Sequence, residues 1–68
     1  METSARNQLR GTVKAVSIGA VMAEVIVDVN GIDVVAAITK DSAERLELAT
    51  GRSVVAIVKA TDVMIGVD

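Results

Sequence analysis

The dipeptide Asn30-Gly31 restricts what this chain can fold into more than any other feature, because it lies between two runs rich in valine and isoleucine. Both residues tolerate the positive φ that the type I′ turn of a β-hairpin demands. Before the dipeptide, a small apolar residue stands at every second position from 21 to 29, and after it an apolar run extends from Ile32 to Thr39. The sequence therefore predicts two antiparallel strands joined by a tight turn.

Three further segments show the period of two that is typical of strands. A first strand is predicted before the hairpin, with a short turn at Ser17–Gly19 after it. Its inward-facing residues are Leu9, Gly11, Val13 and Ala15, and its outward-facing ones are Gln8, Arg10, Thr12 and Lys14. A fourth strand is predicted around Val54, Ala56 and Val58, and a fifth around Val63, Ile65 and Val67.

One short helix is predicted between the third and fourth strands. The segment Asp41–Leu46 has Asp41 as a suitable N-cap and Glu44 three residues later, and Thr50-Gly51 ends the connection. Five strands with a helical turn at this place match the OB-like arrangement. The expected fold is an all-β, five-stranded, OB-like Greek-key barrel that forms a single domain over residues 1–68.

The size of the chain points to partner chains. A domain of 68 residues buries only about 60% of the surface that its unfolded chain exposes, so its core is marginal. The chain has no cysteine or histidine, which excludes disulfides and a zinc site of Cys or His ligands. Several predicted strands are also apolar on both faces, which would leave an apolar patch on a monomer. We therefore expect a homo-oligomer.

Composition excludes other classes of function. The chain has a net charge of -2 and no aromatic residue, whereas single-stranded nucleic acids are bound by basic grooves with aromatic side chains. Without histidine, cysteine or a Gly-rich phosphate loop, the sequence indicates no enzyme, although Ser4 or Ser42 with Lys59 is a conceivable nucleophile and base. Charges interrupt every apolar run, so no membrane span is predicted. The polar N-terminus has no signal-peptide pattern, so a cytoplasmic protein is expected.

Three segments contain candidate anion-binding residues. Arg6, after Ser4, offers a fork of N–H donors that suits a tetrahedral oxyanion. Thr39 and Ser42 flank the predicted helix start, and Lys59-Ala60 follows the fourth strand. Each has a structural alternative: Arg6 as a solvated charge, Thr39 and Ser42 as capping residues, and Lys59 as an edge-strand charge that discourages aggregation.

The same segments resemble a known family, the molbindins, which are Mop-type molybdate-binding proteins. The resemblance extends from Ser4 to Val67 and is carried by three motifs: SARNQLRGTV, VAAITKDSAERLEL and VVAIVKATDVMIGV. It implies an OB-like barrel that assembles into a hexamer, a trimer of dimers, with oxyanions held between subunits. Carried over by motif, the oxyanion-binding positions are Ser4, Arg6, Thr39, Ser42, Lys59 and Ala60. No direct metal ligand is implied.

The resemblance also implies a function. It predicts that the chain binds molybdate or tungstate for storage, buffering or delivery of molybdenum. The same module resembles the ligand-binding repeats of the molybdate-responsive regulator and the accessory domains of molybdate-transport ATPases, so an anion-sensing module that acts on a partner is an alternative. A second kind of site near the threefold axis, around Ala20, Val21 and Met22, is left unassigned because no polar residue marks it.

Overall fold

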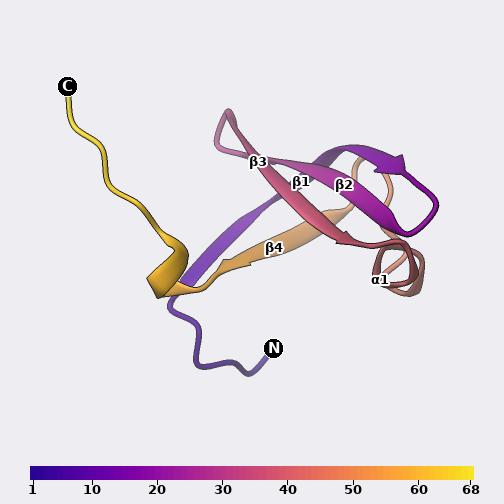
Figure 1. The fold of residues 1–68 in the computed structure, drawn as a ribbon, viewed down its shortest axis with the longest axis horizontal. Helices are drawn as coiled ribbons and strands as arrows, with labels where there is room; N and C mark the ends of the chain where they lie inside the picture. Colours follow the sequence, from indigo (N-terminus) through magenta and orange to yellow (C-terminus); the bar gives the residue numbers. More distant parts are fainter.

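The computed structural model describes residues 1–68 and contains a four-stranded antiparallel sheet with one short helix (Figure 1). The strands follow the order β3-β2-β1-β4 across the sheet. This confirms the all-β fold class. The elements, in chain order, are β1 (Asn7–Ile18), β2 (Met22–Val29), β3 (Ile32–Thr39), α1 (Lys40–Arg45), β4 (Ser53–Val58) and the 3₁₀ turn η1 (Ala60–Asp62).

The β2–β3 hairpin forms as predicted. Asn30 and Gly31 have φ values of 51° and 86°, as a type I′ turn requires. Val29 is opposite Ile32, and the Gly31 N–H donates to the Asp28 carboxylate at 3.0 Å. The turn residues thus set the register that directs alternate side chains of both strands to the same face.

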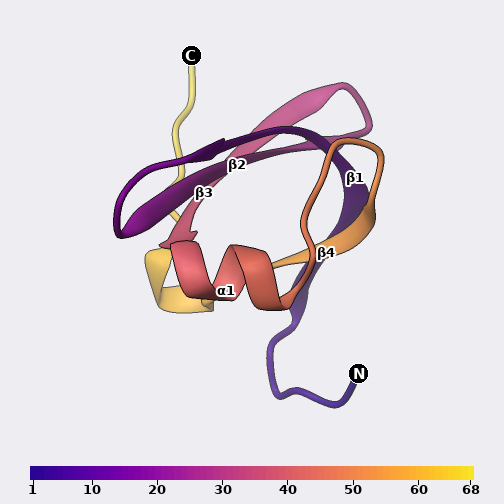
Figure 2. The same cartoon turned by 90° about the vertical axis from the view of Figure 1, so that its right-hand side faces the viewer.

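Strand β1 is long and bent, and it joins the two halves of the sheet. Its first half pairs with β4 and its second half with β2, and Figure 2 shows the curvature between them. A register shift between Val13 and Ala15 marks a bulge. Because a bulge adds one residue to one strand only, it reverses which residues face inward. The predicted inward direction of Ala15 is therefore wrong: Ala15 is exposed, and Val16 packs against the core.

The first turn also differs from the prediction. Strand β1 continues through Ile18, so Ser17 belongs to the strand and the turn follows at residues 19–21. The Gly19 N–H donates to the Met22 carbonyl at 2.8 Å and closes this turn. Val21, the first residue of the predicted apolar alternation, lies in the turn and is 71% exposed.

The core is small and lies on the concave face of the sheet. Val13, Val25 and Val27 are buried, and partly buried side chains from all four strands and from Leu48 pack against them. Beside the core, the space between β3 and β4 remains open as a hollow of about 310 Å³, which we call the apolar trough. Its lining is entirely hydrophobic and consists of Val25, Val27, Val34, Val35, Ala36, Ile38, Leu46, Leu48, Val54, Val55, Ala56, Ile57 and Val58.

The predicted fifth strand is absent from the single chain. Residues 63–68 form no strand, and Met64, Ile65 and Val67 are 92%, 87% and 95% exposed. In Figure 1 this segment leaves the body of the molecule. An alternating pattern indicates which side chains share a face, but a strand forms only where a neighbouring edge accepts its backbone hydrogen bonds. The single chain is therefore an open sheet and not a closed barrel.

Helix α1 forms where a helix was predicted, but its N-cap is Thr39 and not Asp41. Thr39 ends β3 with extended backbone angles, φ −71° and ψ 150°, and its hydroxyl accepts from the Ser42 N–H at 3.1 Å. An N-cap residue needs non-helical angles, which the last residue of a strand already has. Asp41 lies instead in the first turn of the helix.

This cap has a measurable consequence. Replacing Thr39 by alanine removes the acceptor and is expected to lower the free energy of unfolding by about 1 kcal/mol. Thr39→Ser keeps the hydroxyl and should retain most of the stability. Urea denaturation of both variants at one protein concentration measures the difference. An equal loss in the serine variant would show that the methyl group, and not the cap, stabilises this junction.

Candidate functional site

Four of the six predicted site residues lie together at one end of the sheet. Ser4, Arg6, Lys59 and Ala60 line a hollow of about 550 Å³. The pairing of β1 with β4 explains this, because Asn7 lies opposite Val58, so the segment before β1 runs beside the segment after β4. We call this hollow the basic hollow.

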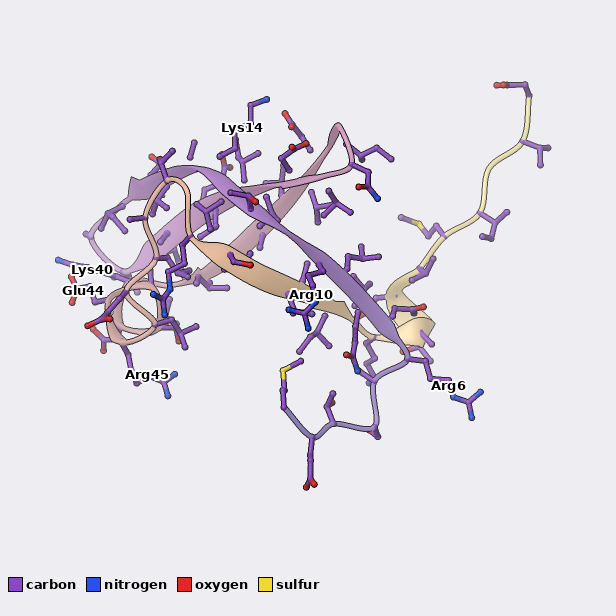
Figure 3. All side chains as sticks on the ribbon, turned by 180° about the vertical axis from the view of Figure 1, so that it is seen from behind. Arg6, Arg10, Lys14, Lys40, Glu44 and Arg45 are labelled. Carbon is purple, nitrogen blue, oxygen red and sulfur yellow. The ribbon has the colours of Figure 1, made fainter.

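The lining of the basic hollow suits an anion. Arg6 and Lys59 supply two cationic groups, and no carboxylate is among the lining residues. Neither cation takes part in a salt bridge; the ion pairs of the structure join Lys14 to Asp33 at 3.1 Å and Lys40 to Glu44 at 3.9 Å. In Figure 3 the Arg6 side chain points away from the ribbon into solvent. Its guanidinium is therefore free to donate to an oxyanion.

Neutral groups complete the basic hollow. The Ser4 side chain adds a hydroxyl donor, and η1 begins at Ala60, where a helical turn leaves backbone N–H groups without intrahelical partners. Sequence reasoning did not assign Ala5 or Ile57, which also line the hollow. Ile57 is 48% exposed and lies two residues before Lys59. Because residues two apart in an extended chain share a face, this spacing was the signal that could have identified Ile57.

Thr39 and Ser42 do not join the basic hollow. They lie at the start of α1, at the other end of the sheet from η1 (Figure 1). The Thr39 hydroxyl donates to the Ser42 hydroxyl at 2.8 Å, in addition to capping the helix. Within one chain these two residues are thus engaged in local structure. They can approach an anion held by Arg6 only if they come from a different copy of the chain.

No group of three or more acidic, histidine or cysteine side chains is placed to hold a metal ion. None of the helices has the length and apolar character that a membrane crossing requires. A second polar hollow is lined by Lys14 with Asp28 and Asp33, and its one cation is paired with Asp33, so the basic hollow suits an anion better.

The fold and the site together define a class of protein. It is a small all-β module with an open antiparallel sheet, one short helix and a cationic hollow where the segment before β1 meets the segment after β4. The TOBE domain model matches residues 3–65. Molybdenum-pterin-binding protein 3 of Clostridium pasteurianum is 48% identical over 66 residues, which is 96% of this chain and 97% of that protein. The chain therefore belongs to the TOBE domain family.

Two further comparisons agree with this assignment. The solved structure of a molybdate binding protein from Sporomusa ovata has a TM-score of 0.91 at 46% identity, covering 96% of this chain and 97% of that one. The molybdenum transport protein ModE of Azotobacter vinelandii is 48% identical over 66 residues, but the chain spans only 24% of that protein. The resemblance to the molbindins is thus confirmed.

Proposed function

We propose that this chain binds molybdate or tungstate and serves in the storage, buffering or delivery of molybdenum in the cytoplasm. The observation that carries the proposal is the basic hollow, which both Arg6 and Lys59 line without a carboxylate among the lining residues. Relatives that match along nearly their whole length are named for binding molybdenum-pterin or molybdate. The proposed module extends over residues 1–68.

Binding would follow from charge and geometry. Molybdate is a tetrahedral dianion, and two cations offset its charge while hydroxyl and backbone N–H groups satisfy its oxygens. Hydrogen bonds to charged groups contribute roughly 1.5–3 kcal/mol each, about twice the neutral value. Sulfate has the same charge and shape but is smaller, so donors spaced for the larger ion would hold sulfate less well. This argument does not separate molybdate from tungstate.

We propose further that the complete site forms between copies of the chain. Ser4, Arg6, Lys59 and Ala60 would come from one copy, and Thr39 and Ser42 from another. Exposed apolar side chains on the sheet, such as Met22 at 49% and Val35 at 59%, support burial against other copies. The proposed assembly is a homo-hexamer, a trimer of dimers, in which each barrel is closed.

The proposed role is binding without catalysis, with no nucleic acid or membrane as partner. A second candidate role is an anion-sensing module that acts on a partner protein. It is favoured by the match to ModE, in which a segment like this chain makes up 24% of a longer protein. The two roles differ in partners and exchange kinetics, and they share the same site chemistry.

The proposal is tested by calorimetric titration of the protein with molybdate and, separately, with sulfate at equal ionic strength. Because the chain lacks Trp and Tyr, its concentration must come from amino-acid analysis. We expect a molybdate Kd of about 1 µM or lower, which corresponds to at least ~8 kcal/mol, and much weaker sulfate binding. A saturating ligand should also raise the melting temperature by mass action. No heat and no stabilisation with molybdate would refute the proposal.

A further inference from the structure

The segment before β1 is held at a single residue, Ala5, which lies between the site residues Ser4 and Arg6. The Ala5 N–H donates to the Thr3 hydroxyl at 3.2 Å, and the Ala5 carbonyl accepts from the Gln8 side-chain amide at 2.8 Å. We call these two hydrogen bonds the Ala5 anchor. Ala5 is the one residue of the chain whose backbone N–H and carbonyl are both bonded to side chains.

Little else orders this segment. Residues 1–6 lie outside the helices and strands, and no backbone-to-backbone hydrogen bond reaches them. The ladder between β1 and β4 begins only at Asn7, which pairs with Val58. Chain ends without such ties are usually poorly ordered. The Ala5 anchor therefore provides the hydrogen bonds that hold Ser4 and Arg6 beside the basic hollow.

The anchor also acts against a repulsion. One position beyond the Asn7–Val58 pair, the same register brings Arg6 opposite Lys59. Like charges that face each other across two strands repel, and they favour a chain end that turns away from the sheet. The hydrogen bond from Gln8 to Ala5 resists this movement, because it ties the residue before Arg6 to a residue within β1.

We propose that Gln8 is a positioning residue for the anion, which acts through Arg6 and Ser4 and does not itself bind the anion. Gln8 is not among the residues that line the basic hollow, and its amide already donates to Ala5. A donor that is ordered before binding loses less conformational freedom when the anion arrives, and this raises affinity. The inference rests on the proposed function and deepens it.

Gln8→Met tests the inference, because methionine has a similar length but no N–H donor. We expect the molybdate Kd, measured by calorimetric titration, to rise about 3- to 10-fold, while the urea midpoint stays unchanged. Thr3→Val removes the other half of the anchor and should also raise the Kd. The control is Thr12→Val, which alters an exposed residue of the same strand outside the basic hollow and should leave the Kd unchanged.

A double-mutant cycle separates positioning from direct contact. In an Arg6→Ala background the main group to be positioned is gone, so we expect Gln8→Met to change the Kd less than about 2-fold there. A full effect in that background would mean that Gln8 touches the anion itself, and it would overturn the inference. A lower urea midpoint with an unchanged Kd would equally overturn it, because the anchor would then serve the fold alone.

A measurement without molybdate distinguishes this inference from the proposed function. NMR order parameters of the amides at positions 5 and 6 report how well the segment is held. We expect them to fall in Gln8→Met and in Thr3→Val and to stay unchanged in Thr12→Val. Unchanged values in the first two variants would refute the anchor whether or not the protein binds molybdate, whereas a protein that shows the fall but binds no molybdate would refute the proposed function.

Discussion

Arg6→Ala is expected to weaken molybdate binding at least ~10-fold while leaving the fold intact. Arg6 lines the basic hollow, takes part in no salt bridge and is the group there best shaped to donate two hydrogen bonds to one oxyanion. Loss of one charge-assisted bond of about 1.5–3 kcal/mol corresponds to roughly a 10- to 100-fold rise in Kd. Calorimetric titration with molybdate measures the change.

The matched control is Arg52→Ala. Arg52 is also exposed, but it precedes β4 and lies at the other end of that strand from Lys59, outside the basic hollow. Both variants lose one positive charge, so a general effect of net charge would weaken binding equally in the two. We expect the Arg52 variant to bind as the unaltered protein does. Unchanged affinity in the Arg6 variant would refute its place in the site.

Gly11→Ala is expected to cause the largest loss of stability, about 3 kcal/mol. A Cβ at position 11 would clash with the Asp28 carbonyl oxygen and would lie 2.9 Å from the Val27 side chain. The first of these contacts is with backbone, so β1 and β2 would have to separate where β1 passes from β4 to β2. Overpacking of this kind commonly costs about 1–3 kcal/mol, a large share of the stability of a small domain.

Urea denaturation followed by circular dichroism measures this loss. Gly66→Ala is the control, because a Cβ there meets no atom within 4 Å, and we expect its effect to stay within about 0.5 kcal/mol. Both proteins are compared at the same concentration, since assembly adds to apparent stability. A Gly11 variant as stable as the control would mean that the two strands can separate at little cost.

Much of the fold was predictable because its signals are local. The Asn30-Gly31 turn, the bounds of β3 and the helix after it follow from residue types within a few positions of one another. The bulge near Lys14 was not predictable, because an unbroken alternation of side chains does not indicate where one strand gains an extra residue. That bulge decided which of Ala15 and Val16 faces the core.

The arrangement of the candidate site residues was not predictable from the sequence. The motifs named six positions, and chemistry alone explains why Arg6 and Lys59 suit an anion. Only strand pairing showed that the segments before β1 and after β4 meet. It also separated Thr39 and Ser42, whose hydroxyls are hydrogen-bonded to each other at the start of α1.

By itself, the sequence determined the first four strands, the turn between β2 and β3 and the presence of one short helix after β3, since these depend on side-chain chemistry and short-range periodicity. The tertiary structure decided which strands pair, where β1 bends, that the N-cap is Thr39, and that the segment 63–67 has no neighbour in its own chain. The reason is that pairing between distant segments depends on hydrogen-bonding edges and register, which no local pattern specifies.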